Sequence, residues 1–246
     1  GLPMTGKTTI FSLLTQTIYD GAYKNEAEEK IAEVKDPRMK KLSSMFEPNK
    51  TTFATLDFVD IPSFDQSADR KEKGRILQMI QNVDSLLFVI RAFENDNVPF
   101  PDNGDTPTSR LEMLNAELIL RDLEVVENRL ERIENQKKKK KPTSDDIKEE
   151  EYLMVVKTAL EEGKFANSVE ADDETKKLVS SLSLFTLKPI VTVINVDEEQ
   201  FKNNKFNGID EVKTACSNHG FAYIEISGKI ESDLIEIRTR AYKKDV

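Results

Sequence analysis

The first eight residues constrain this chain more than any other segment. Residues 1–8 read GLPMTGKT and match the pattern G-x-x-x-x-G-K-[ST] in full. In this pattern the glycines let the backbone wrap closely around a phosphate, and the helix that follows directs its first N–H groups at the anion. Apolar residues then recur at a helical spacing, at Ile10, Phe11, Leu13 and Leu14. The segment therefore predicts a P-loop that binds the phosphates of a nucleotide.

The residue types assign roles within this loop. Lys7 is expected to reach the outer phosphates, and the Thr8 hydroxyl is expected to hold Mg²⁺. The nucleotide-binding residues expected here are Gly1, Pro3, Met4, Thr5, Gly6, Lys7, Thr8 and Thr9. A P-loop normally follows a buried strand. Nothing precedes Gly1, so we expect the chain to be a piece of a longer protein.

Patterns typical of strands and helices alternate along much of the remaining sequence. Strands are expected at residues 28–34, 53–61, 85–90, 188–194 and 222–226. Helices are expected at residues 38–46, 75–82, 208–218 and 229–242. This alternation favours a layered α/β sheet.

The region 108–185 has a different pattern, rich in Leu, Glu, Lys and Arg. Apolar residues from Leu111 to Ile133 are spaced three and four apart, and Leu153, Val156 and Leu160 form a matching series. Such spacing is typical of a coiled-coil seam. We therefore predict an antiparallel helical arm at 108–185, with the basic run Lys137–Lys141 at its tip, inserted into a nucleotide-binding domain formed by 1–107 and 186–246. The arm accounts for a charged fraction of 33%, against about 25% in an average protein.

Composition excludes several classes of protein. A single cysteine, Cys216, rules out a disulfide framework and a multi-cysteine zinc site. No apolar run approaches the roughly 20 residues of a membrane helix, and residues 1–20 lack the basic start and long apolar stretch that are typical of a signal peptide. We expect a cytoplasmic protein, favour a monomer, and expect no membrane partner. The net charge of −9 argues against a broad nucleic-acid surface but allows a local basic patch.

Three further segments follow expected strands, where α/β proteins bind ligands. Asp60 stands at the end of its strand, in the place of an acidic residue that holds Mg²⁺ through water. Asn195, Val196 and Glu198 follow a buried strand and are candidates to contact the base. The backbone of Ser227, Gly228 and Lys229 is a second candidate for that contact. The segment 195–198 also fits a helix cap with an acidic first turn, and this alternative stays open.

These segments resemble the Obg-like ATPase family, in its YchF group of translation-factor-related P-loop NTPases. RAFENDN at 91–97 and NAELILRDL at 115–123 carry the resemblance further, with DPR at 36–38 and LEEGK at 160–164 as additional landmarks. The resemblance extends from Gly1 to about Tyr242. It implies a Ras-like P-loop nucleotide-binding domain, a three-layer α/β/α fold, interrupted by a coiled-coil arm. It also implies a TGS domain beyond this chain, and the ribosome or ribosomal RNA as partner.

The resemblance also bears on which base is bound. Related GTPases recognise guanine with Asn-Lys-x-Asp, whose aspartate accepts hydrogen bonds from two guanine N–H groups. Here Val196 replaces the lysine and Glu198 the aspartate. One extra methylene displaces the carboxylate by about 1.5 Å, which spoils a bidentate hydrogen bond. The family accepts ATP in preference to GTP, and we predict the same preference here.

Hydrolysis is predicted from the segment after Asp60. The corresponding family motif is Asp-x-x-Gly followed by an apolar residue, and here Ser63 replaces the glycine and Phe64 is the apolar residue. We assign catalytic positions to Lys7, Ser63 and Phe64. Serine adopts glycine-type backbone angles less freely, and no threonine lies between Asp20 and Lys50 to serve in the first switch. Turnover is therefore expected to be slow.

Two other functions remain compatible with the sequence. One is a nucleotide-binding scaffold with negligible turnover, which Ser63 and the glycine-poor segment 65–75 favour. The other is an RNA-binding protein that uses Lys137–Lys141, for which binding would weaken steeply with salt. A small-molecule kinase is disfavoured, because the sequence has no evident lid or acceptor site.

Overall fold

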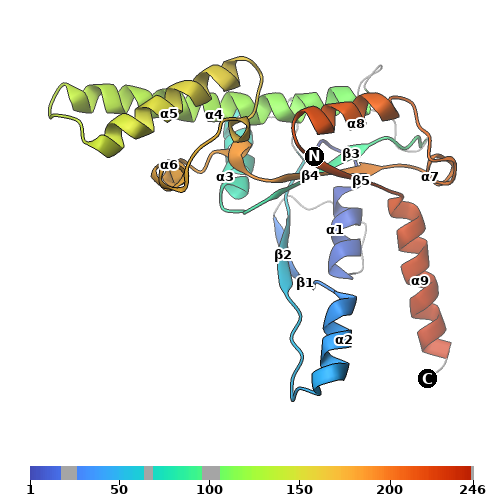
Figure 1. The fold of residues 1–246 in the computed structure, drawn as a ribbon. Coiled ribbons are helices and arrows are strands. Elements are labelled where there is room, and N and C mark those ends of the chain that lie inside the picture. Colours follow the sequence, from blue (N-terminus) through green and yellow to red (C-terminus); the bar gives the residue numbers. More distant parts are fainter. Residues whose placement is uncertain (18–26, 64–68, 96–105, 245–246) are drawn as a thin grey trace. The chain divides into compact units, whose positions relative to one another are not determined.

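The computed structural model describes residues 1–17, 27–63, 69–95 and 106–244. The chain divides into two compact units (Figure 1). Unit 1 is formed by Gly1–Thr5 and Phe64–Ile226, and unit 2 by Gly6–Ser63 and Ser227–Val246.

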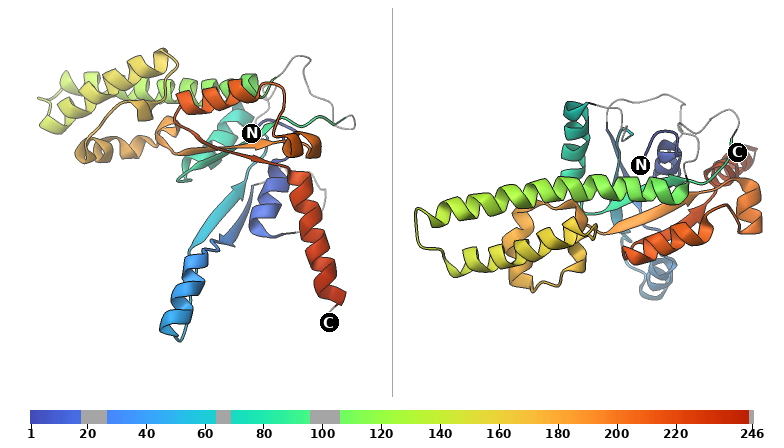
Figure 2. Two further views of the ribbon diagram at one scale, coloured as in Figure 1. Left: turned by 45° about the vertical axis from the view of Figure 1, so that its right-hand side comes forward. Right: turned by 90° about the horizontal axis from the view of Figure 1, so that it is seen from above.

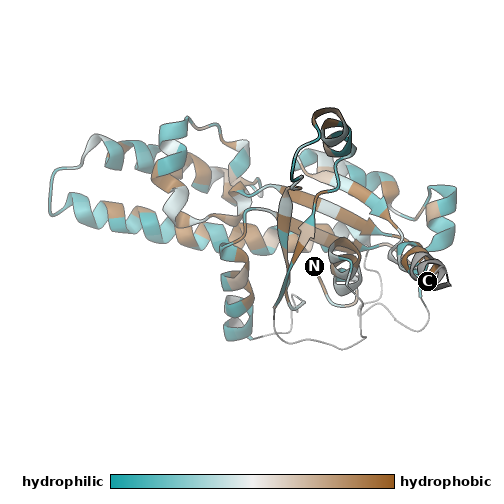
Figure 3. Ribbon diagram, turned by 90° about the horizontal axis from the view of Figure 1, so that it is seen from below, coloured by the Kyte–Doolittle hydropathy of each residue, from teal (hydrophilic) through white to brown (hydrophobic). Residues whose placement is uncertain are grey.

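Unit 1 is built on a parallel three-stranded sheet. The strands are β3 (Leu86–Arg91), β4 (Ile190–Asn195) and β5 (Ala222–Ile226), in the order β3-β4-β5. In register, Ile90 pairs with Ile194, which pairs in turn with Glu225. The central strand β4 is the most buried, as its nearly continuous apolar sequence predicts for a parallel strand. Figure 3 shows apolar residues concentrated on these strands.

Unit 1 also contains a series of helices. They are α3 (Arg70–Gln81), α4 (Pro107–Lys137), α5 (Ser144–Glu161), α6 (Asp173–Val179), α7 (Glu198–Asn203) and α8 (Ile209–Asn218). Short 3₁₀ turns lie at Ala166–Ser168, Ser180–Leu182 and Phe185–Leu187. Helices α4 and α8 pack against each other, α4 contacting β3 and α8 contacting β5 (Figure 2). Among the described helices, none is long and apolar enough to cross a lipid bilayer.

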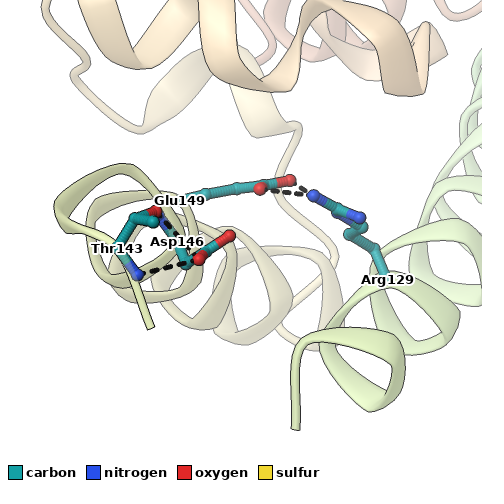
Figure 4. Close-up of polar contacts among 4 residues, drawn as sticks. All are labelled: Arg129, Thr143, Asp146 and Glu149. Atoms are coloured by element: carbon teal, nitrogen blue, oxygen red, sulfur yellow. Dashed lines mark hydrogen bonds and ion pairs between the residues drawn. The ribbon is translucent and has the colours of Figure 1, made fainter. Parts of the chain in front are cut away.

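Helices α4 and α5 carry the predicted apolar seam, and they pack side by side and antiparallel (Figure 2). Each begins with a capping box, in which a threonine and the third helical residue exchange hydrogen bonds. In α4 the pair is Thr106 and Ser109. In α5 it is Thr143 and Asp146, which Figure 4 shows. The buried seam residues are Leu111, Leu114, Leu118, Ile119, Val126, Ile133, Leu153, Val156 and Leu160. Leu123 and Leu130, which the same pattern predicts in the seam, are only half-buried.

Ion pairs join the two helices along their length. Arg129 donates two hydrogen bonds to the Glu149 carboxylate, at 2.7 and 2.6 Å (Figure 4). Lys137 contacts Glu150 near the tip. The rest of the predicted basic run, residues 138–141, is exposed between the two helices. The domain boundaries at 107/108 and 185/186 stay a prediction.

Unit 2 combines α1 (Lys7–Thr15), β1 (Glu28–Glu33), α2 (Pro37–Phe46), β2 (Thr55–Asp60) and α9 (Gly228–Lys244). Strands β1 and β2 form an antiparallel ribbon in which Glu28 pairs with Asp60. Helix α1 packs against both strands and against α9, and it buries Ile10 and Phe11. Of the apolar stripe that the sequence predicts for α1, Ile10 and Phe11 are therefore buried, whereas Leu13 is half-buried and Leu14 is exposed.

All the expected strands and helices are present, with their ends shifted by a few residues. Helices α6 and α7 were not predicted as separate elements, since six or seven residues are too few to establish a helical period. Helix α6 lies within the predicted helical region 108–185, and α7 follows the predicted alternative of a helix cap at 195–198. The strands expected at 28–34 and 53–61 pair with each other as β1 and β2. Sequence periodicity does not specify strand partners, so this pairing was not predictable.

The seam between α4 and α5 gives a direct test of packing. Leu153 is fully buried in it, whereas its neighbour Met154 is 59% exposed. We expect Leu153→Ala to lower the free energy of unfolding by about 2–5 kcal/mol, because it leaves a cavity in the seam. The matched Met154→Ala change should alter it by less than about 0.5 kcal/mol. Urea denaturation of both variants measures the difference, and equal losses would contradict the assigned seam.

Candidate functional site

The predicted P-loop turns through two left-handed residues. Gly6 has φ of 90° and precedes the first residue of α1, and Met4 has φ of 56°. Glycine adopts this region without penalty, but a side chain there costs of the order of 1 kcal/mol, and such strain is typical of functional loops. The Thr5 hydroxyl donates to the Leu2 carbonyl at 3.2 Å and holds the first part of the loop.

Helix α1 begins at Lys7, directly after this turn. The first intrahelical hydrogen bond runs from the Ile10 N–H to the Gly6 carbonyl at 2.9 Å. Gly6 has no side chain that could cap the helix. N–H groups in the first turn of a helix have no intrahelical acceptor, and together they attract anions. Thr8 and Thr9 lie in this first turn and are half-exposed.

The Lys7 ammonium lies next to Ser63 and is influenced by Asp60, both of which belong to unit 2 as Lys7 does. Its Nζ donates a hydrogen bond to the Ser63 Oγ at 2.7 Å. Burial lowers the pKa of Lys7 to about 8, while the charge of Asp60 acts in the opposite direction. Lys7 is thus a cation at neutral pH that pays a desolvation cost, which an added anion would offset.

Ser63 differs from what its place in the motif suggests. Its backbone does not lie in the left-handed region that would demand glycine. Its hydroxyl, for which the sequence motif predicts no role, accepts the hydrogen bond from Lys7. Phe64 lies outside the described residues. Thr51, Thr52 and Thr55 are the first threonines after Lys50 and the remaining candidates for the first switch. Thr51 forms a 2.7 Å hydrogen bond with Ser43 of α2.

Two oxygen donors suited to Mg²⁺ also belong to unit 2. Asp60 ends β2 with a half-buried side chain, and Thr8 is the second residue of α1. A carboxylate and a hydroxyl fit Mg²⁺, which protein sites usually share with phosphate oxygens and water. Within the described part of the chain, no group of three or more His, Cys, Asp or Glu side chains could hold a metal ion by itself.

Asn195 joins the predicted base-binding segment to the P-loop within unit 1. Its side-chain Nδ2 donates to the Thr5 carbonyl at 3.0 Å, and the residue is only 6% exposed. Its own carbonyl accepts hydrogen bonds from the N–H groups of Ala92 and Phe93 at 2.8 and 3.0 Å. The next residue, Val196, is buried and donates its N–H to the Ile226 carbonyl at 2.9 Å. Strand ends β3, β4 and β5 are therefore tied together here.

The segment does begin a helix, as the alternative interpretation predicts, and Asp197 is its capping residue. Asp197 and Gln200 form a capping box with hydrogen bonds of 2.9 and 3.0 Å, and Glu198 is the first residue of α7. Gln200 also donates to the Ala92 carbonyl at 3.0 Å. Sequence reasoning missed Asp197 and Gln200, although the Asp-x-x-Gln spacing is itself a capping-box signal. The Glu198 carboxylate lies 3.8 Å from Lys202.

The last predicted segment begins α9 in unit 2. Ser227 is buried, and its carbonyl accepts a hydrogen bond from the Glu231 N–H at 3.1 Å. Gly228 is buried as well, whereas Lys229 is exposed. Each unit thus holds its own share of the predicted site: the Lys7, Asp60 and Ser63 group in unit 2, and the Asn195 contact with Thr5 in unit 1. The roles of all these residues toward a nucleotide stay predictions.

Comparison with known proteins identifies relatives along nearly the whole chain. No protein-family model matches. The chain is 34% identical over 244 residues to the protein named ribosome-binding ATPase YchF of Bacillus subtilis, and 30% identical over 243 residues to that of Escherichia coli O157:H7. Each match covers 96% of this chain but 66% of the relative, so the chain spans just under two thirds of their length.

A solved structure supports the fold. The YchF GTPase of Schizosaccharomyces pombe matches 96% of this chain and 66% of its own, with a TM-score of 0.80 and 24% identity. The predicted α/β P-loop fold class is therefore confirmed.

The electrostatic link between Asp60 and Lys7 is directly testable. Asp60→Asn removes the charge that raises the pKa of Lys7, so that pKa should fall below its present value of about 8. Asp57→Asn, on the same strand, should leave it unchanged. The pH dependence of amine labelling at Lys7, read by mass spectrometry, measures both values. An unchanged or higher pKa in Asp60→Asn would show that Asp60 does not act on this ammonium.

Proposed function

This chain belongs to the YchF group of Obg-like P-loop proteins, and we propose that it is a Mg²⁺-dependent NTPase that binds and hydrolyses ATP in preference to GTP. The observation that carries the proposal is the position of Lys7, which begins α1 directly after the left-handed Gly6 and donates a hydrogen bond from its Nζ to the Ser63 Oγ at 2.7 Å. The relatives named ribosome-binding ATPases support the hydrolase activity and the ribosome as partner.

The loop and α1 would bind the triphosphate. Backbone N–H groups from Met4 to Thr8 surround the phosphates, and Lys7 stabilises the charge on the β- and γ-phosphates. Thr8 and Asp60 would hold Mg²⁺, which neutralises charge on the phosphate oxygens when bound. Because Lys7 is partly desolvated, its attraction to a phosphate is stronger than that of a lysine in open water.

Ser63 and Phe64 would set the rate of hydrolysis. Ser63 orients Lys7 through its hydroxyl before nucleotide arrives, and the apolar Phe64 stands where related GTPases carry a water-positioning glutamine. Positioning and electrostatics supply almost all of the catalysis in phosphoryl transfer. Without a polar group to orient the attacking water, the chain turns over slowly.

The segment Asn195–Glu198 would receive the base, together with the backbone of Ser227, Gly228 and Lys229. Val196 is buried and apolar, and Glu198 carries its carboxylate one methylene further than an aspartate would. That displacement removes the bidentate hydrogen bond on which guanine selectivity depends. ATP is accordingly the favoured substrate, with GTP as the weaker one.

Calorimetric titration in Mg²⁺ tests binding and base preference together. We expect the unaltered chain to bind ATP more tightly than GTP, and Lys7→Ala to weaken ATP binding by about a hundredfold, or about 2.7 kcal/mol, because a partly buried charge pair is lost. Lys41→Ala, an exposed lysine of α2, should leave the ATP affinity unchanged. Tighter binding of GTP would contradict the assignment of Glu198.

Phosphate release distinguishes the ATPase from the nucleotide-binding scaffold. The unaltered chain should release phosphate from ATP slowly but faster than Lys7→Ala does. Equal rates in the two proteins, combined with retained ATP binding in the unaltered chain, would leave only the scaffold.

The tip between α4 and α5 is the candidate contact with ribosomal RNA. Lys137 and Lys138 have ion-pair partners in Glu150 and Glu134, and Lys139, Lys140 and Lys141 extend the exposed basic surface. Lysines that neutralise phosphates release counterions, so binding weakens as salt rises. The same surface would serve the alternative RNA-binding function. A ribosome-bound role would place the protein in the cytoplasm.

Neutralising the tip tests this contact. We expect the triple change of Lys139, Lys140 and Lys141 to Gln to weaken binding to purified ribosomes. The slope of the logarithm of the binding constant against the logarithm of the salt concentration should become shallower by about two to three. The same changes at exposed Lys35, Lys40 and Lys41 serve as the control. Co-sedimentation with ribosomes across a salt series gives both quantities. Equal effects of the two triple variants would exclude a specific role for the tip.

A further inference from the structure

Asp122 of α4 is a buried acid with no role in the site described so far. It is 1% exposed. Its Oδ1 accepts a hydrogen bond from the Phe185 N–H at 3.0 Å, and its Oδ2 accepts one from the Thr186 N–H at 2.7 Å and one from the Thr186 hydroxyl at 2.6 Å. Burying a carboxylate is costly unless such partners compensate. Asp122 therefore ties the 3₁₀ turn Phe185–Leu187 firmly to α4.

Lys188 fixes the same stretch of chain from another side. Its ammonium donates to the carbonyls of Ile80 and Gln81 at 3.3 and 2.8 Å, and it also contacts the carbonyl of Val83. These carbonyls lie at the C-terminal end of α3, where a cation is favoured. Residues 185–188 are thus held between α4 and α3, and we call this stretch the junction.

The junction leads directly into the central strand of the sheet. The Pro189 carbonyl accepts a hydrogen bond from the Leu86 N–H at 2.9 Å, and β4 begins at the next residue. Strand β4 pairs on both sides, and Val193 and Ile194 are buried. A close-packed strand moves as a unit rather than deforming. Its far end is Asn195, whose side chain holds the Thr5 carbonyl.

We propose that Asp122 is a positioning residue for the nucleotide site. By fixing the junction to α4, it sets the position of β4, and with it the hydrogen bond from Asn195 to the P-loop at Thr5. All of these contacts lie within unit 1. The inference rests on the proposed nucleotide binding, and it assigns to helix α4 an influence on that binding.

The experiment measures ATP affinity in Mg²⁺ by calorimetry for the unaltered chain and for Asp122→Asn. The asparagine amide replaces one acceptor oxygen of Asp122 with an NH₂ donor. That donor then faces an N–H or O–H donor of the junction, so a hydrogen bond is lost and we expect the turn to shift. We expect the Kd for ATP to rise by about two- to thirtyfold. Glu131→Gln, an exposed acid of the same helix, should leave the Kd unchanged. Thr186→Val replaces the hydroxyl that donates to Asp122 with a methyl group and should also raise the Kd for ATP. This variant provides the test if Asp122→Asn does not fold.

A double-mutant cycle separates positioning from a loss of stability. If Asp122 and Thr186 act through Asn195, neither variant should weaken ATP binding further once Asn195→Ala has been introduced. An equal effect on the Kd with and without Asn195→Ala would overturn the inference.

Two other outcomes are distinct. An unaltered Kd in both single variants, together with normal ATP binding by the unaltered chain, would overturn this inference alone. Failure of the unaltered chain to bind ATP would overturn the proposed function, and this inference with it.

Discussion

The proposed chemistry depends on a single ammonium group that is held partly out of water. Burial lowers the pKa of Lys7 to about 8, and the opposing charge of Asp60 helps to keep the group protonated. A lysine so placed is a partly desolvated cation, which attracts a phosphate more strongly than a fully hydrated lysine does. The left-handed Gly6 contributes to the same site, because it ends the loop directly before Lys7, the first residue of α1.

Local features of the site were predictable from sequence because they depend on neighbours in the chain. The spacing of Gly1, Gly6 and Lys7 defines the loop, and the residues that follow define α1. The same holds for α4 and α5, whose apolar periods are long enough to be read directly. Family resemblance then supplied the fold class, which the solved YchF structure supports.

Contacts between distant residues were not predictable in this way. Nothing in the sequence couples Asn195 to Thr5, or Lys7 to the hydroxyl of Ser63, because each pair is separated by more than fifty residues. The substitution of glycine by serine at position 63 suggested backbone strain, whereas the structure gives the side chain a hydrogen-bonding role. Hydrogen bonds between residues far apart in the sequence form only once the chain has folded, and hydrophobic periodicity does not indicate which residues they join.

Helix α4 extends far beyond the buried Asp122, so a small tilt about this residue moves the end of the helix a long way. From Asp122 to Lys137 the helix rises by about 22 Å at 1.5 Å per residue. Treated as a rigid lever pivoting at Asp122, this part of the helix would swing its end by about 4 Å for a tilt of about ten degrees. A large partner bound near Lys137 would therefore need only a small force to tilt α4 about Asp122, because that force acts far from the pivot.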